Sequence, residues 1–217
     1  MVRASATTLE SECTEAERAL MQRILTTSDL KDRHLEIGTA AGGTLKELIK
    51  LYSDRGSVPQ FCVIDPLSYY PNQREIIERN LVGAGIDPDS VEFWQGITLD
   101  FVTRERSIGG RFDFVFIDGD HRAYPVTVDL QWADLVNKGG FIFLHDSSPK
   151  FPGVTWAIER FLQNCPEFEK VGQEGSLVVL HKVAERSKPC VAKADLVAAR
   201  WWQLRFKWAR SLRKRLG

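Results

Sequence analysis

The chain alternates short apolar runs with longer segments in which apolar residues recur every three or four positions. The apolar runs show no regular polar alternation, which is typical of strands covered on both faces. We expect strands over residues 34–37, 61–64, 91–95, 112–117, 141–144 and 176–181. Helical spacing predicts helices over residues 15–26, 44–49, 72–84, 125–136 and 156–162.

Local signals mark several boundaries of these elements. Thr14 followed by Glu17 forms a capping box at the start of the first helix, and Gly85 closes the third. The Lys-Gly-Gly segment at 138–140 is expected to stop the fourth helix, and residues 172–175 are expected to form a turn. Strand and helix units in succession predict an α/β, doubly wound, mostly parallel sheet with right-handed crossovers and helices on both faces.

Composition supports one globular domain with an appendage. The chain has 217 residues, of which 43% are hydrophobic and 27% charged. Without a basic and then apolar leader pattern or a spanning apolar run, the chain is expected to be cytoplasmic. The cysteines show no metal-ligand spacing, and we expect them to be reduced and structural: Cys13, Cys62, Cys165 and Cys190.

The net charge of zero hides an uneven distribution. Residues 1–182 hold 19 Lys and Arg against 27 Asp and Glu, whereas residues 183–217 hold 10 against 2. We therefore separate a domain over 1–182 from a basic tail over 183–217, with the boundary near Pro189. The acidic body and the lack of a base-reading motif argue against nucleic acid as a partner.

The tail predicts an amphipathic helix from Ala194 onward. Its apolar stripe consists of Val197, Trp201, Leu204, Trp208 and Leu212, with Arg200, Lys207, Arg210 and Lys214 away from it. Such a helix either lies peripherally on an anionic membrane, here the inner surface, or packs on the acidic body or a second subunit. The sequence leaves these alternatives open.

Polar side chains follow two of the buried strands. Asp118, Asp120 and His121 come directly after the strand over 112–117, and His145 and Asp146 after the strand over 141–144. Ligands bind at the carboxyl ends of strands in such sheets. Carboxylates gathered there favour a divalent ion such as Mg²⁺, and His121 suits a general base near neutrality. In the simpler interpretation, Asp120 and Asp146 cap local structure and His121 is a surface residue.

A glycine-rich loop follows the first strand. Gly38, Thr39 and Gly42 belong to the segment Gly-Thr-Ala-Ala-Gly-Gly, which differs from the dinucleotide fingerprint. The loop either lets a ligand approach the backbone or is simply a tight turn. Asp65, at the end of the second strand, stands where an acid binds ribose hydroxyls in nucleoside-binding sheets.

Taken together, these segments resemble class I S-adenosylmethionine-dependent methyltransferases. The similarity covers residues 33–182 and is greatest to catechol, caffeoyl-CoA and macrolide-sugar O-methyltransferases. It rests on Leu-Glu-Ile-Gly-Thr-Ala-Ala-Gly-Gly, Val-Ile-Asp, Phe-Val-Phe-Ile-Asp-Gly-Asp-His and Gly-Gly-Phe-Ile-Phe-Leu-His-Asp. The resemblance implies a Rossmann-like sheet of seven strands and methyl transfer to a hydroxyl of a sugar or other small metabolite.

The resemblance also implies roles for individual residues. The cofactor S-adenosylmethionine would contact these positions: Glu36, Gly38, Thr39, Gly42, Asp65, Gly96, Ile97 and Asp118. Mg²⁺ or Mn²⁺ would bind Asp118 and Asp146, with His145 as a third ligand or a support, and His121 would be the base. The pair His145-Asp146 replaces the usual two acids or Asp-Asn, which leaves the metal requirement open. The rival functions are a catalytically silent binding module and a nicotinamide-dependent oxidoreductase.

Overall fold

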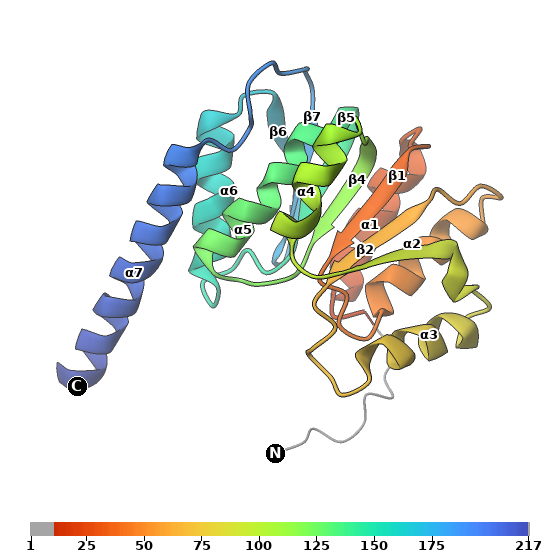
Figure 1. Ribbon diagram of the computed structural model, residues 1–217, viewed down its shortest axis with the longest axis horizontal. Helices are drawn as coiled ribbons and strands as arrows, with labels where there is room; N and C mark the ends of the chain where they lie inside the picture. The colour runs from red at the N-terminus through yellow and green to blue at the C-terminus, as the bar shows by residue number, and fades with distance from the viewer. Residues whose placement is uncertain (1–10, 217) are drawn as a thin grey trace.

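The protein is built on one seven-stranded sheet. The computed structural model describes residues 11–216, with side chains described up to Phe206 and at Trp208. The strand order is β3-β2-β1-β4-β5-β7-β6 (Figure 1). The strands are β1 (Arg33–Ile37), β2 (Phe61–Asp65), β3 (Val91–Gln95), β4 (Phe112–Ile117), β5 (Val136–Leu144), β6 (Phe168–Glu174) and β7 (Leu177–Lys182). Strands β1 to β5 pair in parallel and β7 is antiparallel to both of its neighbours, which confirms the predicted Rossmann-like α/β fold.

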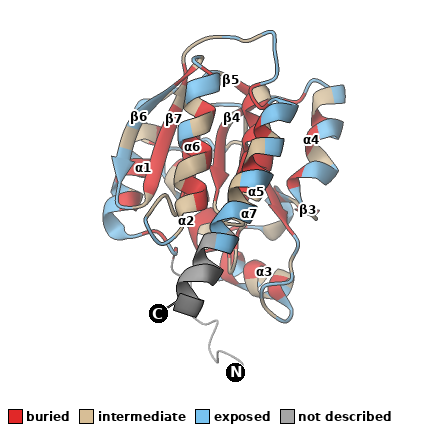
Figure 2. Ribbon diagram, turned by 90° about the vertical axis from the view of Figure 1, so that its left-hand side faces the viewer, coloured by how far each residue is buried: buried red, intermediate tan, exposed pale blue. Residues whose placement is uncertain are grey.

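Helices cover both faces of the sheet (Figures 1 and 2). They are α1 (Glu15–Thr27), α2 (Gly43–Ser53), α3 (Gln73–Gly83), α4 (Thr98–Ser107), α5 (Ala123–Asp129), α6 (Pro152–Asn164) and α7 (Lys193–Leu216). Short 3₁₀ helices span Pro88–Ser90 and Leu130–Leu135. The predicted capping box is present, because Thr14 Oγ1 accepts from the Glu17 amide and Glu17 Oε2 from the Thr14 amide.

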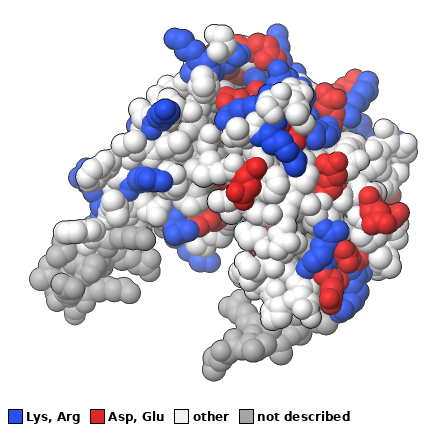
Figure 3. Space-filling model, viewed as in Figure 1, with Lys and Arg blue, Asp and Glu red and all other residues white. Residues whose placement is uncertain are grey.

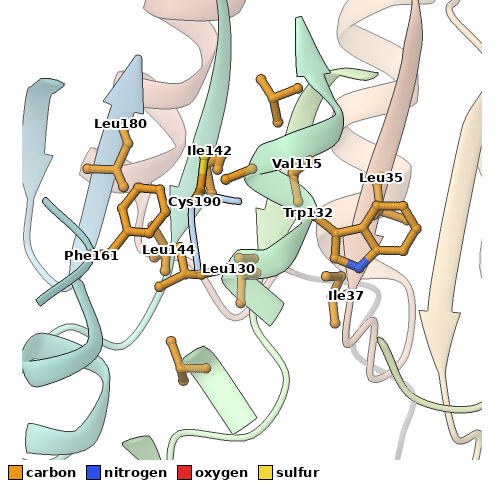
Figure 4. Close-up of a cluster of buried hydrophobic side chains, with 14 of the residues drawn as sticks. Leu35, Ile37, Val115, Leu130, Trp132, Ile142, Leu144, Phe161, Leu180 and Cys190 are labelled. Carbon is orange, nitrogen blue, oxygen red and sulfur yellow. The ribbon is translucent and has the colours of Figure 1, made fainter. Parts of the chain in front are cut away.

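Two hydrophobic cores lie on opposite faces of the sheet, and alternate strand residues supply them. In β4, Val115 and Ile117 enter the core beneath α4, α5 and α6, whereas Phe114 and Phe116 enter the core beneath α1, α2 and α3. Figure 4 shows the first core, where Trp132 lies beside strand residues such as Leu35. The unbroken apolar run of β4 follows from this burial of both faces.

Several predicted boundaries were wrong. The helix expected over 125–136 is α5 followed by the 3₁₀ helix, and β5 already begins at Val136, so residues 138–140 lie within a strand. The turn expected over 172–175 overlaps the edge strand β6, and α4 was not predicted. Strand β6 is mostly exposed and α4 presents few apolar residues, so neither carries a hydrophobic pattern.

The four cysteines are buried and form no disulfide, as expected. Within residues 11–216, no helix combines the length and apolarity needed to cross a membrane. The predicted apolar stripe of α7 can be followed through Trp208, whereas the side chains of Lys207, Arg210, Leu212 and Lys214 lie outside the described part of the chain.

Candidate active site

The site lies where the strand order reverses direction. From β1 the chain builds outward through β2 and β3, and it then returns to place β4 on the other side of β1. The loops after β1 and β4 diverge at such a switch point and leave a crevice at the carboxyl ends of the strands. A cavity of about 690 Å³ opens there, and its walls include Gly38, Asp65, Gly96, Asp118 and His121.

The glycine loop after β1 is held in a conformation that requires glycine. Gly38 has a φ of +83°, and a Cβ on it would lie 2.6 Å from the backbone oxygen of Asp118. Gln73 and Asn80 of α3 fix the loop from outside by donating side-chain hydrogen bonds to the carbonyls of Ala40 and Ala41. Gly42, also at positive φ, precedes the first residue of α2, so this helix begins one residue before Thr44, which was expected near its cap.

Asp65 is the last residue of β2, and its carboxylate connects the surrounding loops by hydrogen bonds. Its carboxylate accepts hydrogen bonds from the amides of Thr39 and Leu67, at 2.9 and 2.6 Å, and from the Gln73 side chain at 3.2 Å. An ionised carboxylate offers about four acceptor sites. One site therefore remains for a ligand in the large cavity, which Asp65 lines together with Ile97.

Glu36 is the most unusual group of the site. It is 1% exposed, and its Oε2 has no hydrogen-bond partner among the residues that the structure describes. Burial, together with the nearby charges of Asp118 and Asp65, raises the pKa of Glu36 to about 8. The Thr39 side chain beside Glu36 lowers this pKa in part, and among the described residues the buried Thr39 hydroxyl has no other hydrogen-bond partner. Both residues line a second, smaller cavity of about 110 Å³, so these polar atoms lie beside a space in which a ligand group could satisfy them.

The ends of β4 and β5 bring four polar side chains together. Donor atoms of Asp118, His145 and Asp146 all lie within 4.8 Å of one another. His121 Nε2 lies 2.7 Å from an oxygen of Asp146 and 4.0 Å from one of Asp118, and its ring stacks on Phe151. This confirms that the two strand ends are neighbours. Two carboxylates and an imidazole at this separation are a donor set that suits a divalent cation.

The charges in this cluster perturb one another. The hydrogen bond to Asp146 raises the pKa of His121 above its ordinary value. Burial opposes ionisation of Asp146, but the His121 hydrogen bond outweighs it and holds the pKa of Asp146 below its usual range. Burial raises the pKa of Asp118. Burial disfavours charge on His145 too, yet its hydrogen bond with Asp118 raises the pKa of His145 strongly.

Two acidic residues near the cluster have structural partners. Asp120 accepts from the Arg122 amide and forms an ion pair with the Arg122 side chain, so its contacts are local, but it does not cap α5, whose N-cap is Arg122 without a side-chain cap hydrogen bond. Glu17 contacts His145 Nε2 at 3.4 Å across 128 positions of the sequence. Glu17 also accepts from Thr14 and Ser176, so its oxygens are fully used.

Sequence reasoning missed three contributors to the site. Glu17 was recognised only as a capping residue, and Phe151 and Gln73 were not considered. No local signal could have revealed them, because partners of each lie far away in the sequence: His145 for Glu17, His121 for Phe151 and Ala40 for Gln73.

Comparison with known proteins places this architecture in a family. Residues 35–147 match the methyltransferase domain family, and the chain belongs to it. The catechol O-methyltransferase of Mycobacterium tuberculosis is 35% identical over 125 residues, which are 56% of this chain and 50% of that protein. A second relative, protein R132 of Acanthamoeba polyphaga mimivirus, is 32% identical over 117 residues, 52% of this chain and 50% of that protein. The chain thus spans about half the length of the curated relatives it matches.

Solved structures share the fold. An O-methyltransferase from Bacillus cereus, solved in complex with SAH, superposes with a TM-score of 0.60 at 19% identity, covering 79% of this chain and 83% of that one. A TDP-rhamnose 3'-O-methyltransferase of calicheamicin biosynthesis has a TM-score of 0.55 at 15% identity, with 76% of each chain covered. At this level of identity the likeness concerns the fold.

Proposed function

We propose that the protein transfers a methyl group from S-adenosylmethionine to a hydroxyl of a sugar or another small metabolite. One observation carries the proposal: five residues expected to hold the cofactor line the same cavity as the expected base His121, namely Gly38, Asp65, Gly96, Ile97 and Asp118. Membership of the methyltransferase domain family and the O-methyltransferases among the relatives and structural neighbours support it. The sugar-methylating neighbour supports a sugar as the substrate class.

The unsatisfied atoms in the smaller cavity fit the amino acid part of this cofactor. Glu36 Oε2 would accept from the ammonium group, which would favour the ionised form of Glu36, and the Thr39 hydroxyl would pair with the carboxylate. The free acceptor site of Asp65 suits a ribose hydroxyl, with Gly96 and Ile97 against the adenine. Gly38 has no side chain to obstruct this approach.

The cluster at the ends of β4 and β5 fits a divalent cation. Asp118 and Asp146 would be its carboxylate ligands, and His145 a third ligand or the hydrogen-bonded support of Asp118. S-Adenosylmethionine supplies a methyl group already activated on sulfur, and a bound Mg²⁺ or Mn²⁺ would supply Lewis acidity toward the substrate hydroxyl. The protein's own task is then to hold the hydroxyl in line and to remove its proton.

His121 is placed to take this proton. In the ligand-free protein this Nε2 hydrogen-bonds Asp146 at 2.7 Å, so His121 would accept the hydroxyl proton there in its neutral form and with Asp146 engaged elsewhere, as a cation ligand would be. Stacking on Phe151, with ring centroids 4.3 Å apart, fixes the imidazole plane. Tyr124, two residues after Arg122, also lines the cavity, and its hydroxyl accepts a hydrogen bond from Arg200 of α7.

Calorimetry and a methyl-transfer screen test this function. We expect S-adenosylmethionine to bind at micromolar to millimolar concentration and NAD not to bind; the reverse result would favour an oxidoreductase. Transfer of labelled methyl to a panel of catechols and nucleotide sugars should identify the substrate class. Cofactor binding with no transfer to any hydroxyl compound would favour a silent binding module.

Removal of metal tests the cation. After treatment with EDTA and gel filtration, activity should fall and return with Mg²⁺ or Mn²⁺, and Asp118→Asn should abolish this recovery. Full activity in the presence of chelator would reject a metal-dependent reaction. His121, oriented by Asp146, would then be the general base without a metal ion.

A further inference from the structure

Helix α7 packs on the body through one face only. Ala199 is fully buried, and Trp202 stacks on Trp156 of α6 with ring centroids 5.6 Å apart. Gln203 accepts a hydrogen bond from the amide of Tyr124 at the start of α5. These contacts fix the rotation of the helix about its axis, and therefore decide which residues it turns outward.

The predicted apolar stripe lies on the outward face. Val197, Trp201, Leu204 and Trp208 recur at helical spacing, and they are 54%, 65%, 50% and 74% exposed. The hypothesis that this stripe packs on the protein's own body is thus wrong, because a different face makes that contact. Two exposed tryptophans on one side of a helix form an apolar surface that a soluble domain has no structural reason to keep.

Basic residues border this stripe on both sides. Lys193 lies along one flank and Arg205 along the other, both exposed; Arg200, exposed on the same flank as Lys193, donates a hydrogen bond to the Tyr124 hydroxyl. In sequence α7 holds eight Lys and Arg and a single acid, Asp195, which is buried in an ion pair with Arg160. On the face shown in Figure 3, the described atoms over α7 are basic or uncharged.

We propose that the outward face of α7 binds peripherally to the surface of an anionic lipid bilayer. The two tryptophans and the aliphatic residues enter the headgroup boundary, while the flanking cations contact lipid phosphates and carboxylates. The helix projects past the sheet, so that its outward face can lie along a flat surface (Figure 1). This inference does not depend on the reaction that the cavity performs.

The charge pattern favours lipid over a second copy of the chain. If two α7 stripes paired, the basic flanks of both helices would meet across the seam and repel. An anionic bilayer instead presents negative charge on both sides of the inserted stripe. Apolar insertion and electrostatic attraction then act together, as anchoring by a single helix requires.

Sedimentation with lipid vesicles tests the proposal on the full chain. We expect binding to vesicles of phosphatidylcholine with one third phosphatidylserine, weaker binding in 0.5 M salt, and little binding to phosphatidylcholine alone. Trp201→Ser with Trp208→Ser should lower the partition coefficient at least roughly tenfold. Lys193→Gln with Arg205→Gln should lower it roughly 25-fold, because each cation near an anionic surface contributes about fivefold.

The matched control removes exposed apolar residues elsewhere. Val82→Ser with Ile108→Ser alters two side chains on α3 and beyond α4, 62% and 67% exposed, and should leave vesicle binding unchanged. Circular dichroism and melting curves should be unchanged in all three double variants, since every altered side chain is exposed. Absence of wild-type binding, or equal binding by the tryptophan variant, would overturn the proposal. A dimer that the tryptophan substitutions dissociate, without vesicle binding, would assign the face to a second copy.

Discussion

Replacing Glu36 with Gln should stabilise the ligand-free protein, and increasingly so as the pH rises. The substitution keeps the shape of a side chain that is 1% exposed and removes its ability to ionise. Within the described residues Glu36 Oε2 has no hydrogen-bond partner, so the Thr39 side chain compensates only part of the loss of water when the carboxylate is charged.

The magnitude follows from proton linkage. Burial raises the pKa of Glu36 from 4.5 to about 8. Below pH 4.5 the carboxyl is protonated in both folded and unfolded chains; between 4.5 and 8 the unfolded chain loses the proton while the folded protein keeps it. The folded state then binds more protons, and the unfolding free energy falls with pH by up to about 1.4 kcal/mol per unit. Between pH 5.5 and 7.5 the difference between variant and wild type should grow by about 2.5 kcal/mol.

Urea denaturation of both proteins without ligand, at pH 5.5, 6.5 and 7.5, measures this difference. All other titrating groups are common to the two proteins, so their contributions to the pH dependence cancel in the difference between the two unfolding free energies. Glu75→Gln, an identical chemical change at an exposed position of α3, controls for the substitution itself. A Glu36→Gln difference that stays constant with pH would mean that the folded protein holds Glu36 ionised, and would refute the reasoning. In the proposed cofactor site the same variant should bind S-adenosylmethionine roughly tenfold to a hundredfold more weakly, because a charge-assisted hydrogen bond is lost.

Three further substitutions test other parts of the site and fold. His121→Ala should lower the methyl-transfer rate roughly 100-fold to 10,000-fold while calorimetry shows nearly unchanged cofactor affinity; His181→Gln, on β7 away from the cavity, should keep wild-type turnover. Gly38→Ala should cost about 2 kcal/mol or more in urea denaturation and weaken cofactor binding, because its φ is +83° and the new methyl group would lie 2.6 Å from a backbone oxygen. Trp202→Ala should lower the unfolding free energy by about 2 kcal/mol through loss of its stacking on Trp156, and a change below 0.5 kcal/mol would contradict the packing of α7 described above.

The strands of the sheet could be predicted because burial on both faces requires a continuous apolar run, which is visible in the local sequence. The apolar run of β4 identifies a covered strand, and the abrupt change at Asp118 marks its carboxyl end. By contrast α4 and β6 escaped prediction. The edge strand β6 has most of its residues exposed, and α4 buries Thr98 and Glu105 beside Val102, so their hydrophobic patterns resemble those of loops.

The candidate site was predictable in its location more than in its contacts. Neighbouring parallel strands end at the same edge of the sheet. The backbone alone therefore brings Asp118 and Asp146 close together, independently of their side-chain contacts. Which partners they take was decided by distant residues: His121 turns to Asp146, and Glu17 reaches His145 from a helix near the start of the described chain.

In helix α7, too, the sequence determined the local pattern and the tertiary structure determined the contacts. Its sequence by itself determined a basic amphipathic helix, since periodicity and charge are local properties. Only the tertiary structure decided that Trp202 faces the body and Trp201 faces outward, because the rotation of a helix depends on the surface it packs against. The sequence likewise determined the alternation of strands and helices and the polar ends of β4 and β5. The contacts across the crevice, and the buried Glu36 carboxyl with its raised pKa, arise only when segments far apart in the chain are packed together.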